Sequence, residues 1–178
     1  MRGRRELVAT TDPPDPLRQG STNLGTDGYE ISTDATRLDR VMIHRFLSQE
    51  AYWARGVPRA VVERAISNSL VFGLYASGEQ VGFARVVTDQ ATFAWLADVF
   101  VLPEHRGRGL GKRLVREVLA HPGLQGLRWF LLGTADAHGL YRQLGFDPLS
   151  PERASRLLGI WREPTEVYGR AADGGDAR

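Results

Sequence analysis

The apolar positions of the chain predict strands and helices in alternation. Apolar runs rich in β-branched and aromatic residues, bounded by polar turns, are typical of buried strands and occur at residues 70–76, 80–88, 92–101 and 128–134. Apolar residues at helical spacing predict helices over residues 40–48, 58–66, 109–121 and 136–144. Asp39 can cap the first of these helices, and Pro58 suits the start of the second.

The order of these elements predicts an α/β sheet of mixed direction flanked by helices. Short polar turns join the strands between residues 70 and 101 into an antiparallel meander, with Val81, Phe83 and Val87 expected on one face. The strand at 128–134 follows a long helix, so it is expected to lie parallel to its neighbour. We expect further strands at residues 29–32, from Phe146 onward, and at the edge over residues 157–161.

Length and composition indicate one domain. A chain of 178 residues is long enough for one substantial core. Residues 1–27 are rich in Pro, Gly and Thr and are expected to form a flexible leader. We assign residues 28–163 to the domain and residues 164–178 to a C-terminal tail.

Composition also limits the function. The chain has no Cys, which excludes disulfides and thiolate chemistry and fits a cytoplasmic protein. The net charge of +2 is too small to favour nucleic acid as a partner. There is no apolar run long enough to cross a membrane. The four His residues lack metal-ligand spacing, so we expect no metal.

The chain is organised around residues 95–121, which read as a strand, a basic glycine-containing turn and an amphipathic helix. This layout directs backbone N–H groups and a helix N-terminus to one point, which favours an anion. Arg106, Arg108 and Lys112 add positive charge there. The turn therefore predicts a phosphate site, with a glycine turn that binds nothing as the alternative.

Two well-known phosphate motifs do not fit. A P-loop requires Gly five residues before the Gly-Lys pair and Ser or Thr after it, but Arg106 and Arg113 occupy those positions. The dinucleotide fingerprint that starts at Gly107 requires a third Gly where the chain has Lys112.

The remaining turn sequence, RGRGLG at residues 106–111, is similar to the R/Q-x-x-G-x-G/A signature of the GNAT superfamily of acetyl-CoA-dependent N-acetyltransferases. A second segment, HGLYRQLGF at residues 138–146, resembles the "LYxxLGF" close of that family. The resemblance covers about residues 29–163 and implies the GNAT fold, with an uncharacterised bacterial branch suggested by residues 52–54 and 134–138.

The resemblance also implies where acetyl-CoA binds. Its pyrophosphate would meet the backbone of the turn, and its pantetheine arm would pair with the backbone of the fourth strand, while the side chains of that strand belong to the core. Gly109 and Gly111 would let the phosphate approach closely. The cofactor-binding residues are accordingly Val99, Phe100, Val101, Arg106, Gly107, Arg108, Gly109, Leu110, Gly111 and Lys112.

Two residues are candidates for catalysis. Tyr141 occupies the position of the family's usual general acid, and a phenol can protonate a departing thiolate. The alternative is a Tyr that only fills space between helix and sheet. Asp98 is the only carboxylate in the fourth strand and is a candidate base, or it caps the turn or pairs with Arg106. His138 and a water chain are the other candidates for the base.

The acceptor pocket is expected between the first two helices and the fourth strand, where Tyr52, Trp53 and Trp95 could hold an amine, or simply pack. The implied function is transfer of an acetyl group from acetyl-CoA to a primary amine on a small molecule or peptide. The alternative is a non-catalytic acyl-CoA-binding regulatory module. A homodimer is the assembly considered.

Overall fold

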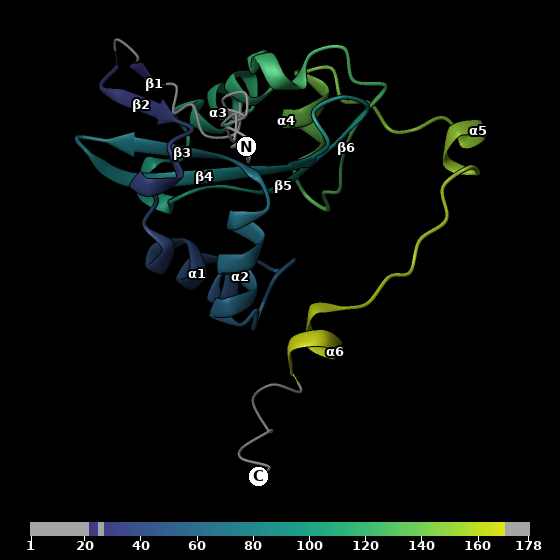
Figure 1. The fold of residues 1–178 in the computed structure, drawn as a ribbon, viewed down its shortest axis with the longest axis horizontal. Coiled ribbons are helices and arrows are strands. Elements are labelled where there is room, and N and C mark those ends of the chain that lie inside the picture. The colour runs from purple at the N-terminus through teal and green to yellow at the C-terminus, as the bar shows by residue number, and fades with distance from the viewer. Residues whose placement is uncertain (1–21, 25–26, 170–178) are drawn as a thin grey trace, which may run out of the picture.

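The computed structural model describes residues 22–24 and 27–169, and Figure 1 shows a central sheet with helices on both faces. Six strands lie in the sheet in chain order. They are β1 (Thr22–Leu24), β2 (Tyr29–Ser32), β3 (Leu70–Ala76), β4 (Glu79–Thr88), β5 (Phe93–Val101) and β6 (Trp129–Leu132). All neighbouring pairs are antiparallel except β5 and β6, which are parallel as the sequence predicted.

Three longer helices pack on this sheet: α1 (Arg40–Gln49), α2 (Arg59–Ser67) and α3 (Leu110–Ala120). Asp39 caps α1 as predicted, because its carboxylate accepts hydrogen bonds from the backbone N–H groups of Val41 and Met42. Pro58 stands immediately before α2. Shorter helices follow β6, namely α4 (His138–Arg142), α5 (Pro151–Ala154) and α6 (Pro164–Tyr168).

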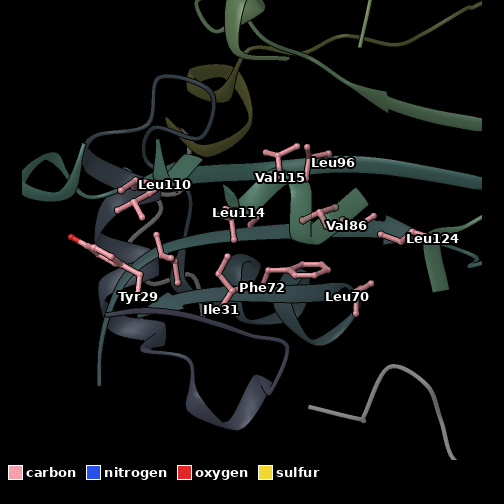
Figure 2. Packing of buried hydrophobic residues seen from close by; sticks show 14 of the residues in the cluster. Tyr29, Ile31, Leu70, Phe72, Val86, Leu96, Leu110, Leu114, Val115 and Leu124 are labelled. Carbon is pink, nitrogen blue, oxygen red and sulfur yellow. The ribbon is translucent and has the colours of Figure 1, made fainter. Parts of the chain in front are cut away.

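Each face of the sheet has its own apolar core. On one face, Leu110, Leu114 and Val115 of α3 pack against residues that include Phe72 and Leu96 (Figure 2). On the other face, α1 and α2 pack against the sheet. There Phe46 stacks on Phe100, with ring centroids 3.9 Å apart. Burial of these side chains supplies the main driving force that holds the helices to the sheet.

A β-bulge between β3 and β4 changes which face of the sheet the residues of β4 reach. Tyr75 pairs with Gln80 and Leu74 pairs with Gly82, so Val81 is an extra residue on β4. As a result Val81 joins the core under α3, whereas Phe83 joins the core under α1 and α2. The prediction that Val81, Phe83 and Val87 share one face was therefore wrong for Val81. Val87 is 41% exposed.

The ends of the chain also differ from expectation. Thr22–Leu24, predicted within the flexible leader, form β1, while residues 1–21 and 25–26 of that leader lie outside the described residues. The predicted tail contains α6, and its residues 170–178 are likewise outside them.

Neither predicted C-terminal strand is formed in the described chain. Phe146 packs its ring edge-on against Phe130 and Tyr141 and is followed by Asp147-Pro148. Residues 157–161 have no strand beside them, and an isolated strand lacks partners for its backbone N–H and C=O groups.

Candidate active site

A short 3-10 helix (Pro103–His105) follows β5, and the glycine turn, residues 106–112, comes next. The last three residues of the glycine turn are the first residues of α3. Gly107 and Gly109 have φ angles of +76° and +75°, which glycine adopts without strain. Gly109 is the N-cap residue of α3. Within the described chain, the backbone N–H groups of residues 107–112 donate to no other group. They form a set of unpaired donors at a helix N-terminus, as an anion site requires.

The glycines of this turn have different roles. A Cβ atom added at Gly107 or Gly109 would meet nothing within 4 Å, so the space above the turn is open. A Cβ atom at Gly111 would instead lie 3.4 Å from Cδ1 of Leu140. The small size of Gly111 therefore lets α3 pack closely against α4.

The basic side chains of the turn are only partly directed outward. Arg106 donates from Nε to the carbonyl oxygen of Val101 at 2.8 Å, and Arg108 donates to the Tyr29 hydroxyl at 3.0 Å. In the described chain, Lys112 takes part in no ion pair. Lys112 is thus the side chain of the turn best placed to meet an added negative charge.

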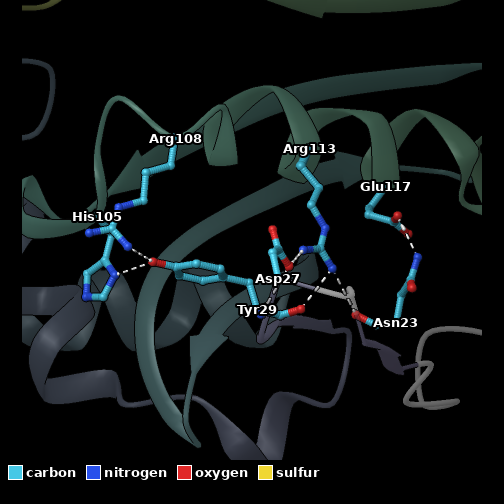
Figure 3. A network of polar contacts seen from close by, with 7 residues as sticks. All are labelled: Asn23, Asp27, Tyr29, His105, Arg108, Arg113 and Glu117. Atoms are coloured by element: carbon cyan, nitrogen blue, oxygen red, sulfur yellow. Dashed lines mark hydrogen bonds and ion pairs between the residues drawn. The ribbon is translucent and has the colours of Figure 1, made fainter.

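A polar network that the sequence did not reveal ties the turn to the β1–β2 hairpin (Figure 3). The Tyr29 hydroxyl lies 3.0 Å from Nδ1 of His105. Arg113 donates to Asp27 at 2.7 Å and to the carbonyl oxygen of Tyr29 at 2.9 Å. The backbone N–H of Tyr29, together with Arg113, lowers the pKa of Asp27. The partners are more than 70 residues apart, which explains why no local pattern indicates the network.

The second half of β5 has a free edge beside the turn. The pairing of β5 with β6 runs from Phe93 opposite Trp129 to Leu96 opposite Leu132 and then stops. Residues 97–101 of β5 therefore pair with β4 only, among the residues described. Their backbone edge can accept an extended ligand as an additional strand. The side chains of Phe100 and Val101 are buried in the two cores, as predicted.

A bulge at this point contains the only carboxylate of the strand, Asp98, whose side chain is 11% exposed. Phe83 pairs with Phe100 and Arg85 with Ala97, so β5 contains an extra residue there. Asp98 lies in this bulge with φ of +52°, a conformation that non-glycine residues seldom adopt.

Asp98 is held on both of its oxygens. Arg85 donates from Nε to Oδ2, and the indole Nε1 of Trp53 donates to Oδ1 at 3.1 Å. Arg85 also donates to the Ser69 hydroxyl at 3.3 Å. The partner of Asp98 is thus Arg85, and Arg106, the partner considered from sequence, binds Val101 instead.

Tyr141 borders a cavity of about 600 Å³. The cavity is lined by the loop after β6, by α4, and by β5 and β6 residues that include Trp95. The pKa of Tyr141 is raised to about 12, mainly by burial and to a smaller extent by the nearby Tyr52 and Asp136. The phenol therefore keeps its proton at neutral pH and can act as a donor.

The predicted acceptor residues meet at the same place. Tyr52 accepts a hydrogen bond from the backbone N–H of Ala135 at 3.0 Å, and its ring lies edge-on to Trp53. A Cβ atom at Gly133 would lie 3.6 Å from the Trp95 ring. All three aromatic side chains are more than a third exposed, so they form a wall open to solvent and do not belong to the core.

The described residues contain no cluster of three or more side chains that could ligate a metal. None of the helices in that part of the chain has both the length and the apolar character needed to cross a bilayer.

Comparison with known proteins identifies the family. Residues 67–148 match the model described as "Acetyltransferase (GNAT) domain". The chain is 33% identical over 135 residues to a protein of Gibberella zeae named "Putative acetyltransferase", a match that covers 64% of this chain and 75% of the relative. The chain belongs to the GNAT family of acetyltransferases.

Solved structures of GNAT proteins agree with this fold. A Xanthomonas campestris protein, titled a "putative acetyltransferase belonging to the gnat family", is 53% identical, with a TM-score of 0.75 and coverage of 79% of this chain and 97% of that one. A Clostridium acetobutylicum protein, titled a "predicted acetyltransferase with acetyl-CoA", is 12% identical and shares the fold, with a TM-score of 0.56 and coverage of 74% of this chain and 94% of that one.

GNAT enzymes use acetyl-CoA. The residues present fit such a ligand at two points, because the unpaired N–H groups of the glycine turn suit its pyrophosphate and the free edge of β5 suits its extended amide arm.

The raised pKa of Tyr141 predicts a loss of stability at high pH. An unfolded tyrosine ionises near pH 10, about two units below Tyr141 in the fold. Between pH 10 and 12 the unfolded chain loses this proton while the folded protein keeps it, so the free energy of unfolding falls as pH rises. Tyr141→Phe should remove about 2 kcal/mol or less of this fall, after allowance for partial exposure.

Urea denaturation of wild type and Tyr141→Phe at several pH values from 9 to 12 measures how the free energy of unfolding changes with pH. The pKa of Tyr75 is also raised to about 12 by burial, so Tyr75→Phe should remove a similar share and the double variant the sum of both. An alkaline decline that is identical in wild type and Tyr141→Phe would contradict the prediction.

Proposed function

We propose that this protein transfers an acetyl group from acetyl-CoA to a primary amine by direct attack, with Tyr141 as general acid. The observation that carries the proposal is a protonated phenol, Tyr141, which lines a cavity together with Trp95 of β5, the strand whose residues 97–101 have a free backbone edge. The acetyl-CoA in the Clostridium acetobutylicum relative supports the choice of ligand.

The glycine turn and β5 would hold the cofactor in this proposal. Backbone N–H groups of residues 107–112 donate to the pyrophosphate, and Lys112 adds a charge. The free edge of residues 97–101 orients the acyl arm through main-chain hydrogen bonds. A backbone N–H at the bulge, where Asp98 and Val99 face β4 without regular pairing, is suited to polarise the carbonyl oxygen.

Acetyl-CoA supplies an activated thioester, whose C–S bond breaks as the new C–N bond forms. Tyr141 then donates its hydroxyl proton to the leaving sulfur, which avoids release of a free thiolate. The high pKa of Tyr141 keeps that proton in place until it is needed. The attacking amine also loses a proton. Solvent in the open cavity can then return a proton to the Tyr141 phenolate and restore the phenol.

We further propose that the acceptor amine approaches along the wall formed by Tyr52, Trp53 and Trp95. The exposed rings can contact an apolar or aromatic group, and their faces attract a cation. Asp98 lies at the edge of this wall, where its carboxylate fixes the Trp53 indole. Each oxygen of a carboxylate can accept more than one hydrogen bond, so Asp98 can still receive a proton from the amine.

The glycine turn predicts how binding is lost. Gly109→Asp should abolish detectable acetyl-CoA binding in isothermal titration calorimetry, because the new carboxylate lies in the open space above the turn and repels phosphate. Gly78→Asp is a matched control, since Gly78 also has a positive φ and open space around it but lies in the β3–β4 turn. Equal affinities of the two folded variants would refute the site.

The acid role of Tyr141 predicts a selective loss of turnover. Tyr141→Phe should lower kcat by about 10²-fold with little change in acetyl-CoA affinity, since only the proton-donating hydroxyl group is removed. The assay follows thiol release from acetyl-CoA across a panel of amines. Tyr75→Phe is the matched control, because Tyr75 has a similarly raised pKa but is a buried residue of β3 that packs under Arg37 and does not line the cavity.

Wild-type turnover in Tyr141→Phe would remove its acid role. Absence of thiol release with every amine, despite normal binding, would favour the alternative of a non-catalytic acyl-CoA-binding module.

The proposed base predicts a change in pH dependence. Asp98→Asn should flatten the acidic limb of the kcat/KM profile, because the amide no longer accepts the amine proton. Trp53→Phe is the control for the positioning effect alone, since it removes the indole contact to Asp98 but leaves the carboxylate. An acidic limb retained in Asp98→Asn would point to His138 or water.

A further inference from the structure

Part of the sheet face opposite α3 lies outside both apolar cores. Cross-strand pairing places Val87, Trp95 and Leu131 in one row across β4, β5 and β6, and Phe93 lies beside Trp129 in the next row. The residues that alternate with them along the strands belong to the core under α3, so these five side chains reach the opposite face. None of the five is in either core, and we call them the uncovered face.

The ion pair between Arg85 and Asp98 marks where the helix-covered part of this sheet face ends. Along β4, Phe83 packs under α1 and α2, Arg85 comes next on the same face, and Val87 begins the uncovered face. Asp98, the partner of Arg85, lies at the same border on β5. The carboxylate proposed to receive the amine proton therefore lies between a covered core and an open apolar surface.

The uncovered face continues into the proposed reaction site. Trp95 and Leu131 also line the cavity that Tyr141 borders. A strand advances about 3.3 Å per residue, so the uncovered face extends along β5 to Phe93, roughly 15 Å from Asp98. An apolar group of this length can lie along the strand while the group at its end reaches Asp98.

The area of this surface suits a small ligand better than a second copy of the protein. The most exposed side chains of the uncovered face and of the adjoining wall are each between 37% and 47% exposed; they are Tyr52, Trp53, Val87, Phe93 and Trp95. Because an aromatic side chain has about 200 Å² of surface, these five together offer about 400 Å² at most. A stable protein interface buries about 800 Å² on each partner.

We propose that the acceptor is a primary amine attached to an extended apolar body, which lies on the uncovered face while the amine reaches Asp98. This inference rests on the proposed function, because that function brings the attacking amine to Asp98 and the thioester. Burial of the apolar body supplies most of the favourable free energy of acceptor binding. The substrate class is therefore long apolar amines, whereas short or strongly hydrated amines bury little surface and bind weakly.

The test measures how affinity depends on the length of the apolar body. Straight-chain primary amines from butylamine to octylamine are titrated calorimetrically into the protein with bound CoA, which carries no acetyl group and so allows no turnover. Complete transfer of one CH2 group out of water changes an equilibrium constant about fourfold. A chain on an open face keeps one side in water, so we expect the dissociation constant to fall about twofold for each CH2 group, roughly 16-fold over the series.

The double variant Val87→Gln, Phe93→Gln should lose most of this gain in affinity, because two amides replace apolar side chains of the uncovered face. Both positions are partly exposed, so the fold should be retained, which circular dichroism verifies. Val41→Gln, at a 61% exposed position on α1, is the matched control and should keep the full gain. If the double variant unfolds, Val87→Thr, which keeps the strand preference of the residue, takes its place and should reduce the gain.

Equal affinities for butylamine and octylamine would overturn the inference, as would a full gain in the folded double variant. Another occupant of the uncovered face would also be detected. Leu158 and Ile160 are 99% and 89% exposed in this structure, so they do not cover the face here. A series that is flat in wild type but steep in the variant Leu158→Asp, Ile160→Asp would show that residues 157–161 cover the face, and the inference would fall.

Thiol release from acetyl-CoA with the same amines separates this inference from the proposed function. Affinity that rises with chain length, without thiol release from any amine, would overturn the proposed function and support the apolar binding face. Thiol release with the same kcat/KM for every chain length, together with equal affinities, would overturn the inference alone.

Discussion

The site depends on where two parallel strands stop pairing. Backbone N–H and C=O groups need partners, and β5 loses its β6 partner after Leu96 while it keeps β4 on the other side. The bulge at Asp98 lies in the same stretch and directs the carboxylate to Arg85 and Trp53. One local irregularity thus yields both the free edge proposed for the cofactor arm and the polar contact at the acceptor wall.

The glycine turn is rigid although it is rich in glycine. The Tyr29 hydroxyl accepts a hydrogen bond from Arg108 and contacts His105, while Arg113 donates to Asp27 and to the carbonyl oxygen of Tyr29. Leu110 and Leu114, next to the turn, are buried in the core under α3. The unpaired N–H groups are therefore fixed in direction before any ligand arrives, which lowers the entropy lost on binding.

Local patterns in the sequence predicted most of the helices and strands. They failed where contacts between residues far apart in the chain determine the structure. Asp39 next to an apolar helical repeat was a reliable start for α1, and the run at 128–134 correctly gave a parallel strand. The prediction of which β4 residues share a face was wrong, because a bulge depends on pairing with the neighbouring strand. The Tyr29 network could not be predicted, since its partners come from separate parts of the chain. The strand expected at 157–161 had strand-forming residues but no neighbour within the chain.

The contact between Gly111 and Leu140 has a consequence for how this enzyme can diversify. Leu140 precedes Tyr141, so the helix that begins at the glycine turn and the helix that bears the phenol are packed against each other. Tyr52 and Trp53 stand on a separate loop after α1, and a hydrogen bond from Ala135 to Tyr52 connects that loop to the rest of the site. In the proposed function, substitutions at exposed loop positions would alter which amine is accepted, while the packing of α3 against α4 would preserve the distance between the proposed cofactor anchor and Tyr141. In the proposed function, acceptor selectivity and proton donation rest on separate elements, so the exposed Tyr52 is the position of this loop where variants could change the acceptor. Ala51 and Val57, at the two ends of the loop, are buried in the core, and Trp53 contacts the proposed base Asp98.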